Sequence, residues 1–291
     1  MEDGFSLALR DTVVGIVGLG LMGGSLAMSL KGKCARLMGF DTHLPTLQLA
    51  LAIGLVDHAS SDFSSLSQLD VLILATPVNV IVEIIPTLPS FIKQPCILMD
   101  LGSTKKLILE SMNRLPDNFE IIGAHPICGK EKLGLENADA NLYRNAPFVI
   151  TPSARTTPNA KSAAQQIIST VGADCIEMSA EAHDHALAFT SHLPFLLSSA
   201  LVNALPKEFA DFIGPGFRSN SRLADTPSHM MVGILQSNRE NVLSAIQSFR
   251  ASLTELEENL QNENYFQMEE LLNKSRFAYQ EITHKSPLST L

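Results

Sequence analysis

VVGIVGLGLMGGSLAMSL, residues 13–30, gives the strongest indication of the fold. Its first five residues are apolar and rich in β-branched side chains, which is typical of a buried parallel strand. Gly18, Gly20 and Gly23 come next, and an apolar helical pattern covers residues 26–30. A strand, a glycine loop and a helix in this order predict a dinucleotide-binding site.

Each glycine has a different task in such a loop. Gly18 permits the tight turn, Gly20 lets the backbone approach a pyrophosphate, and Gly23 lets the helix pack close to the strand. Leu21 and Met22 lie between these glycines, ahead of the helix whose free N-terminal N–H groups can bind phosphate. We therefore expect these five residues to form the cofactor-binding loop.

The motif also requires a carboxylate about 20 residues further on, to bind the adenosine ribose hydroxyls. A second apolar stretch, residues 37–40, ends in Asp41 at this point. A carboxylate there repels a 2′-phosphate, and Thr42 and His43 supply no arginine to bind one. The sequence therefore predicts NAD as the cofactor, with NADP less favoured.

The composition is that of a soluble globular protein. Hydrophobic residues make up 45% of the 291 residues and charged residues 18%, and the length favours two domains. No apolar run approaches the roughly 20 residues of a spanning helix, so we expect no membrane partner. The net charge of −9, with no basic run, argues against nucleic acid. An anionic small molecule would need a local basic patch, for which the candidates are Lys105, Lys106, Lys130, Lys132, Arg218 and Arg222.

Cysteine usage and the N-terminus bear on the compartment. The four cysteines are widely spaced and form no C-x-x-C, which indicates free thiols in a reducing compartment rather than disulfides or a zinc site. Residues 1–10 include two acids near the start and lack the pattern of a signal peptide. We therefore expect a cytoplasmic protein without a metal.

Short apolar runs alternate with helical patterns up to residue 178. Further strands are predicted over 71–75, 96–100, 120–123, 148–150 and 174–178, and helices over 44–53, 80–85, 107–115 and 160–171. This alternation predicts an α/β fold with a doubly wound, Rossmann-type parallel sheet. We assign residues 11–178 to a dinucleotide-binding domain.

Helical periodicity replaces the strand-like runs from residue 179 onward. We assign residues 179–285 to an all-helical domain that binds substrate and forms a homodimer. The evidence for dimerisation is a heptad-like apolar stripe formed by Val242, Ile246, Phe249, Leu253, Leu256 and Leu260. A helix with so long an apolar seam must pack on the rest of its domain or on a second copy.

Three polar residues directly follow predicted strands. Thr76, Ser103 and His125 each come at or just after the end of an apolar run. Ligands of parallel sheets bind at the carboxyl ends of the strands, so this edge would gather the glycine loop, two hydroxyls and an imidazole. Alone, Ser103 could be a helix N-cap and His125 a turn residue before Pro126. Together they indicate an active site.

Five segments of the sequence carry a resemblance to a known family. They are GLGLMGGS (18–25), DLGSTK (100–105), GAHPICGKE (123–131), SHLP (191–194) and GFRSNSR (216–222). In this order and at these separations, they resemble the prephenate/arogenate dehydrogenases of tyrosine biosynthesis. The resemblance spans about residue 13 to about residue 241. The third and fourth segments are far more specific than the glycine loop.

The resemblance implies NAD-dependent oxidative decarboxylation of prephenate to 4-hydroxyphenylpyruvate, or of arogenate to tyrosine. Loss of hydride and of CO2 makes the substrate ring aromatic. By similarity His125 is the base that accepts the ring hydroxyl proton, since a neutral imidazole can do so near neutral pH. Ser103 would place the substrate and the imidazole by hydrogen bonding.

The resemblance also implies the residues that bind the dianionic substrate. Arg222 matches an arginine that binds a carboxylate in bidentate fashion. His192 matches a histidine that lines the cleft, and Glu131 an acid at the cleft mouth. Phe195 stands where many prephenate-preferring members have a second histidine, and Ser219 where relatives have an aspartate. The preference between the two substrates therefore stays open.

We also expect a monofunctional enzyme, without a chorismate mutase segment or a regulatory domain. Two other functions are possible for such a fold. The 3-hydroxyacid dehydrogenases use a lysine from the helical domain, but no lysine lies between Lys161 and Lys207. A dinucleotide-sensing regulator without turnover would have no chemical need for the set Ser103, His125, His192 and Arg222.

Overall fold

The computed structural model describes residues 8–130 and 132–284. One sheet of eight strands has the order β3-β2-β1-β4-β5-β6-β7-β8. The strands are β1 (Val13–Val17), β2 (Arg36–Phe40), β3 (His58–Ser60), β4 (Val71–Leu74), β5 (Cys96–Asp100), β6 (Phe119–Pro126), β7 (Pro147–Thr151) and β8 (Asp174–Glu177). All neighbours are parallel except β6 and β7. The predicted Rossmann-type α/β fold is confirmed.

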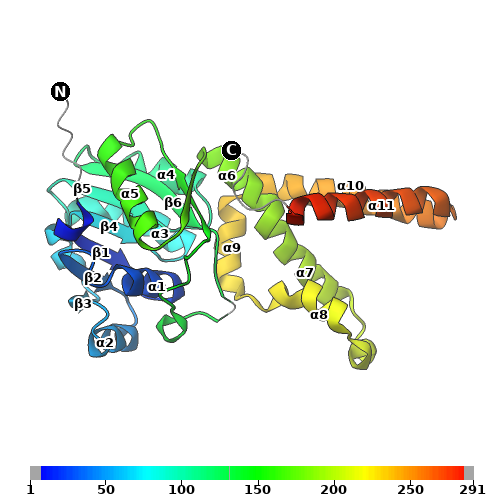
Figure 1. Cartoon of the computed structure of the whole chain (residues 1–291), viewed down its shortest axis with the longest axis horizontal. Helices are drawn as coiled ribbons and strands as arrows, with labels where there is room; N and C mark the ends of the chain where they lie inside the picture. Colours follow the sequence, from blue (N-terminus) through cyan, green and yellow to red (C-terminus); the bar gives the residue numbers. More distant parts are fainter. Residues whose placement is uncertain (1–7, 131, 285–291) are drawn as a thin grey trace. The chain divides into compact units, whose positions relative to one another are not determined.

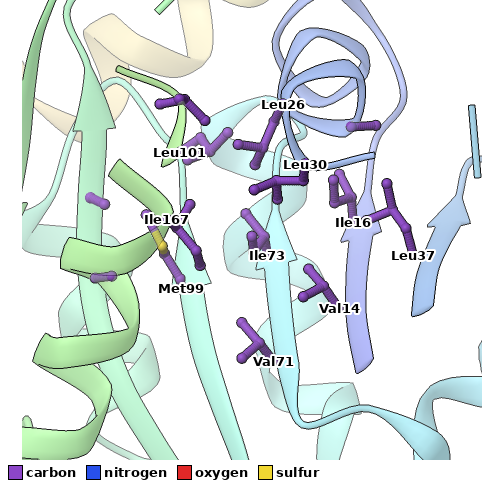
Figure 2. Packing of buried hydrophobic residues seen from close by; sticks show 14 of the residues in the cluster. Val14, Ile16, Leu26, Leu30, Leu37, Val71, Ile73, Met99, Leu101 and Ile167 are labelled. Atoms are coloured by element: carbon purple, nitrogen blue, oxygen red, sulfur yellow. The ribbon is translucent and has the colours of Figure 1, made fainter. Parts of the chain in front are cut away.

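Helices cover both faces of the sheet. They are α1 (Leu21–Leu30), α2 (Leu44–Ala52), α3 (Val78–Ile84), α4 (Lys106–Met112) and α5 (Pro158–Thr170) (Figure 1). Residues of α1, α2 and α5 belong to the core cluster on one face, and those of α3 and α4 to the cluster on the other. Figure 2 shows the first cluster, in which Val14, Ile16 and Leu26 are fully buried. Burial on both faces explains why the strands read as continuous apolar runs.

The helical region that follows β8 was also predicted and is confirmed. It contains α6 (Ala180–Leu187), α7 (Leu193–Ala204), α8 (Pro215–Ser221), α9 (Ser228–Ser237), α10 (Arg239–Gln261) and α11 (Tyr265–His284). A π-helical segment, η5 (Ala188–His192), joins α6 to α7. Short 3-10 segments are η1 (Leu9–Asp11), η2 (Phe63–Gln68), η3 (Ile85–Ser90), η4 (Leu135–Asn137), η6 (Lys207–Phe212) and η7 (Arg222–Asp225).

The continuous helical run Ala180–Ala204 is long and apolar enough to cross a membrane by length and composition alone. It also carries the buried polar side chains of His183, Asp184, His192 and Ser198. Each of those side chains makes a hydrogen bond to another residue of the protein.

Two compact units make up the chain, one ending at Arg239 and the other beginning at Glu240. The predicted domain boundary after residue 178 falls within the first unit, just beyond β8. The second unit contains α11 and all of α10 except its first residue. All of the site residues described below belong to the first unit.

Strand β6 is longer than its parallel neighbour β5. Its first half pairs with β5 up to Ile122, and its second half pairs with β7, with His125 opposite Val149. The antiparallel strand β7 therefore keeps β6 extended beyond the end of β5. This arrangement carries His125 to the edge of the sheet where ligands bind.

The sequence did not reveal β3 or the reversed direction of β7. Strand β3 has only three residues, all half-buried, and lacks an apolar run. A strand's direction depends on its connection and partner, which hydrophobic periodicity does not encode.

We predict that Gly23→Ala lowers both the melting temperature and the affinity for NAD. An added Cβ would lie 1.8 Å from the Gly18 carbonyl oxygen and 3.1 Å from the Ala75 Cβ, so α1 would have to move. Overpacking of this kind typically costs about 1–3 kcal/mol of unfolding free energy. Calorimetry and NAD titration measure both effects.

The matched control is Gly20→Ala, because nothing lies within 4 Å of a Cβ at this position. This variant should melt like the unchanged protein and lose affinity for NAD only. Equal melting temperatures for Gly23→Ala and the unchanged protein would contradict the close packing of α1.

Candidate active site

The glycine loop borders a cavity of about 190 Å³. Gly20, Leu21, Met22 and Thr76, which we predicted to bind the cofactor, line this cavity. Gly18, with a φ of +91°, makes the turn of the loop, and Gly23 packs against Gly18. Thr76 Oγ1 is buried and has no hydrogen-bond partner among the described residues. A polar atom of this kind, beside a glycine loop, fits a polar ligand.

Asp41 follows β2 and contacts the loop from outside. Its Oδ2 accepts a hydrogen bond from the Leu19 backbone N–H at 2.8 Å, and its Oδ1 accepts one from His43 N–H at 2.9 Å. Each carboxylate oxygen has two lone-pair sites, so both can accept a further hydrogen bond from a ribose hydroxyl. The Asp41 carboxylate therefore holds the loop in place as well as standing where the motif requires an acid.

A larger cavity of about 620 Å³ lies beside the first. Four of the predicted site residues line it together, namely Ser103, His125, Phe195 and Arg222. Ser103 also lines the glycine-loop cavity, as do Met230 and Ile234 of α9. The two cavities therefore meet at Ser103, which places a hydroxyl between the predicted cofactor and substrate positions.

The structure does not support the alternative roles considered for Ser103 and His125. Helix α4 begins at Lys106, and its N-cap is Lys105 rather than Ser103. His125 lies inside β6 and not in a turn. Neither residue is needed for local structure in the way those alternatives required.

His125 makes a hydrogen bond that the sequence did not predict. Its Nδ1 lies 2.9 Å from Nε2 of His183, which is fully buried in α6. Burial lowers the pKa of His125 well below 6.5, and the nearby His183, Lys105 and His192 lower it further. The imidazole of His125 is therefore neutral at neutral pH and can accept a proton.

Behind His183 lies Asp184, which is 1% exposed. The His183 Nδ1 is 2.8 Å from Asp184 Oδ1. The same carboxylate accepts hydrogen bonds from the backbone N–H of Lys105 at 2.7 Å and of Lys106 at 3.0 Å. Asp184 therefore satisfies two free N–H groups at the start of α4, where a negative charge is favourable.

A buried ion pair supports the strand end that carries His125. Lys105 and Asp100 are both 0% exposed and contact each other directly. Lys105 Nζ also donates to the Ala124 carbonyl at 2.6 Å, and Asp100 accepts from the Ala124 N–H at 3.2 Å. Burial raises the pKa of Asp100 and lowers that of Lys105, and their mutual attraction opposes both shifts. Lys105, a candidate for a basic surface patch, is therefore a core residue.

His192 was predicted to line the cleft, but the structure places it in a layer beneath the cavity. It is 1% exposed and is not among the residues that line either cavity in the described part of the chain. Its Nδ1 lies 3.2 Å from the amide nitrogen of Asn238, which also donates to the Asp184 carbonyl at 2.6 Å. Burial lowers the pKa of His192 to about 4.

Two of the remaining predicted residues, Arg222 and Phe195, line the larger cavity. Arg222 begins η7 and is exposed, while Phe195 in α7 is partly buried. Ser219 lies in α8, where its hydroxyl donates to the Gly216 carbonyl at 3.1 Å. Glu131 lies outside the described residues.

The residues that sequence reasoning missed are His183, Asp184, Asp100 and Asn238. They come from three separate segments and meet only in the folded chain. The available signal was a histidine and an aspartate side by side at the start of a helix otherwise rich in alanine, seven to eight residues before the SHLP segment.

We predict that Lys105→Met strongly destabilises the protein, because it leaves the Asp100 carboxylate buried without its cation. Removing one partner of a buried ion pair typically costs about 3–5 kcal/mol of unfolding free energy. Chemical denaturation measures the loss. Lys106→Met is the matched control, since the Lys106 side chain is exposed and only its backbone N–H binds Asp184. Equal stability of the two variants would contradict the role of the ion pair.

Comparison with protein families places the chain among dehydrogenases. Residues 26–177 match the family model described as "Prephenate dehydrogenase, nucleotide-binding domain". Residues 179–274 match the model described as "Prephenate dehydrogenase, dimerization domain". Together the two matches cover most of the chain.

Individual proteins give a consistent picture. Prephenate dehydrogenase of Bacillus subtilis is 31% identical over 251 residues, which cover 81% of this chain and 66% of the relative. Cyclohexadienyl dehydrogenase of Zymomonas mobilis is 27% identical over 253 residues, with 84% of this chain and 86% of the relative covered. The chain thus spans about two thirds of the length of the Bacillus relative.

Solved structures extend the similarity to the whole fold. Prephenate dehydrogenase from A. aeolicus, in complex with hydroxyphenyl propionate and NAD+, superposes with a TM-score of 0.87 at 30% identity, covering 95% of this chain and 100% of that one. Synechocystis arogenate dehydrogenase gives a TM-score of 0.81 at 28% identity, with 93% and 99% covered. On these matches in sequence and in structure, the chain belongs to the prephenate dehydrogenase family.

Proposed function

We propose that the protein catalyses the NAD-dependent oxidative decarboxylation of prephenate to 4-hydroxyphenylpyruvate, or of arogenate to tyrosine. The observation that carries this proposal is the position of His125 in a cavity that meets the glycine-loop cavity at Ser103. Family membership supports it, as does a related structure that holds hydroxyphenyl propionate and NAD+ together.

The residues around the loop cavity fit the pyrophosphate and ribose of a dinucleotide. A Cβ at Gly20 would meet nothing within 4 Å, so the backbone is open to a pyrophosphate. Thr76 Oγ1 is available for a hydrogen bond, and Asp41 stands where the ribose hydroxyls are expected. When NAD is bound, its chemical role is to take up the hydride that leaves the substrate ring carbon.

The residues of the larger cavity supply the remaining chemistry. His125 accepts the proton of the ring hydroxyl as hydride leaves the same carbon. The hydroxyl of Ser103 hydrogen-bonds to the substrate and keeps it against the imidazole. The carboxylate on the opposite ring carbon then departs as CO2, and the ring becomes aromatic. Met230, Ile234 and Phe195 line the same cavity with apolar side chains that limit the access of water.

Arg222 binds a carboxylate of the substrate, since a guanidinium at the cavity can form two parallel hydrogen bonds. Phe195 presents an apolar ring to the cavity, so this position offers neither a charge nor a hydrogen bond to the substrate side chain. We assign substrate-binding roles to Arg222, Phe195 and Glu131. His192 contributes to substrate binding indirectly, from its buried position.

The experiment that tests the function is an assay of NADH or NADPH formation, with prephenate and arogenate offered separately and each with NAD and NADP. We expect activity with NAD on at least one substrate. Inactivity in all four combinations, from folded protein that still binds NAD, would refute the proposal and favour a dinucleotide sensor.

We predict that His125→Asn lowers turnover by on the order of 10²–10⁴-fold and leaves NAD affinity unchanged, because the amide cannot accept a proton. Steady-state kinetics and NAD titration separate the two effects. Turnover like that of the unchanged protein would remove His125 as the base.

We predict that Arg222→Ala chiefly raises the Michaelis constant of the substrate, because a lost charge-assisted hydrogen bond typically costs about 1.5–3 kcal/mol. Steady-state kinetics at saturating NAD measure the change. The matched control is Arg218→Ala, an exposed arginine one turn earlier that is not among the described residues lining the cavity. An unchanged Michaelis constant in Arg222→Ala would contradict carboxylate binding.

We further propose that residues 179–285 mediate a homodimer and that the enzyme acts in the cytoplasm. The predicted stripe lies along α10, where Val242 is buried but Leu253 is 52% and Leu260 61% exposed. A second copy would cover these apolar side chains, and the second family model is described as a dimerization domain. Light scattering should give the mass of a dimer, and a monomer at micromolar concentration would contradict it.

A further inference from the structure

We propose that His183 is a positioning residue for the base: together with Asp184 it holds His125 in the tautomer whose Nε2 carries the lone pair. This inference rests on the proposed function, in which His125 accepts the proton of the substrate hydroxyl. His183 itself is fully buried and is not among the residues that line the cavity in the described chain.

The tautomer follows from counting donors along the chain of hydrogen bonds. An ionised carboxylate can only accept, and Asp184 already accepts two backbone N–H groups from Lys105 and Lys106. The His183 Nδ1 must therefore donate to Asp184 Oδ1 across 2.8 Å. A neutral imidazole has one N–H, so the His183 Nε2 is an acceptor.

The same logic extends to the next ring. Since the His183 Nε2 accepts, the His125 Nδ1 must donate to it across 2.9 Å. The Nε2 of His125 is then unprotonated, and His125 lines the cavity in which the substrate hydroxyl would lie. When the hydroxyl proton moves to Nε2, the Nδ1 proton stays in its bond to His183. That bond then has an ionised donor, which strengthens it and stabilises the imidazolium.

The surrounding packing prevents the rings from adopting another arrangement. His183 is 0% exposed and Asp184 is 1% exposed. The rings of His125 and His183 meet edge to face, with 5.1 Å between their centroids. The Asp184 backbone carbonyl also accepts from Asn238. Lys105, which also lies near His125, has its charge paired with Asp100.

A purely structural role explains only part of this arrangement. Capping of α4 accounts for the Asp184 carboxylate, but it does not require an imidazole on the neighbouring residue. It also does not require that imidazole to direct its second nitrogen at His125. Orientation of a base by a third group is the arrangement by which catalytic histidines are held in their reactive tautomer.

The test compares His183→Phe with His185→Phe. Phenylalanine keeps a ring of similar size in the core but removes both nitrogens. His185 lies on the same helix, α6, but is exposed and packs against Phe189. We expect His183→Phe to lower kcat by on the order of 10–10³-fold with the Michaelis constants of both substrates nearly unchanged, and His185→Phe to retain kcat. A kcat for His183→Phe equal to that of the control would overturn the proposal.

Nitrogen-15 NMR of protein labelled at histidine reads the tautomer without substrate or turnover. The His125 signals are identified by their loss in His125→Asn. We expect a protonated Nδ1 and an unprotonated Nε2 in the unchanged protein, and a mixture of tautomers in His183→Phe. An Nε2–H tautomer in the unchanged protein would overturn the proposal, even if His183→Phe failed to fold. An inactive protein with the expected tautomer would refute the proposed function and leave the positioning by His183 intact.

Discussion

The buried ion pair between Asp100 and Lys105 is the interaction on which the rest of the site depends. Removing an ammonium group from water costs several kcal/mol of free energy unless the group is paired and hydrogen-bonded. Here both charges are satisfied, because Asp100 and Lys105 pair with each other and bind the backbone of Ala124. Asp100 accepts a hydrogen bond from the Ala124 N–H, and Lys105 donates one to the Ala124 carbonyl. Ala124 directly precedes His125, so the pair fixes the strand end that presents the imidazole. Both charges therefore serve to position the backbone of this strand end.

A second buried carboxylate connects this strand end to the helical region. Asp184 binds the start of α4 through two backbone N–H groups and binds the ring of His183 through its side chain. The ring then contacts His125. Polar groups that would be costly alone are satisfied by one another, which explains why so many titratable residues can be buried beneath one cavity. The cavity itself is lined by apolar side chains such as Phe195 and Ile234 together with polar ones such as Ser103 and Arg222.

The glycine loop illustrates how much of a site can be local. A Cβ on Gly23 would lie 1.8 Å from the Gly18 carbonyl oxygen, whereas nothing lies within 4 Å of a Cβ on Gly20. These two features follow from residues within one turn, and the sequence therefore predicted them. A Cβ on Gly18 would instead lie 2.8 Å from the Ala75 carbonyl oxygen, a contact that arises only in the folded chain. Asp41 was predicted for its charge, but its hydrogen bond to Leu19 shows that it also braces the loop, which only the folded chain reveals.

Hydrophobic periodicity and strand-end position are local properties, so the sequence alone predicted the Rossmann-type sheet, the helical region after β8 and the gathering of Ser103 and His125 at one edge. The antiparallel direction of β7, the burial of His192 and the contact of His183 with His125 became visible only in the folded chain. His125 and His183 are 58 positions apart, and a hydrogen bond between them depends on how helices pack on strand ends. No periodicity in the chain records that packing.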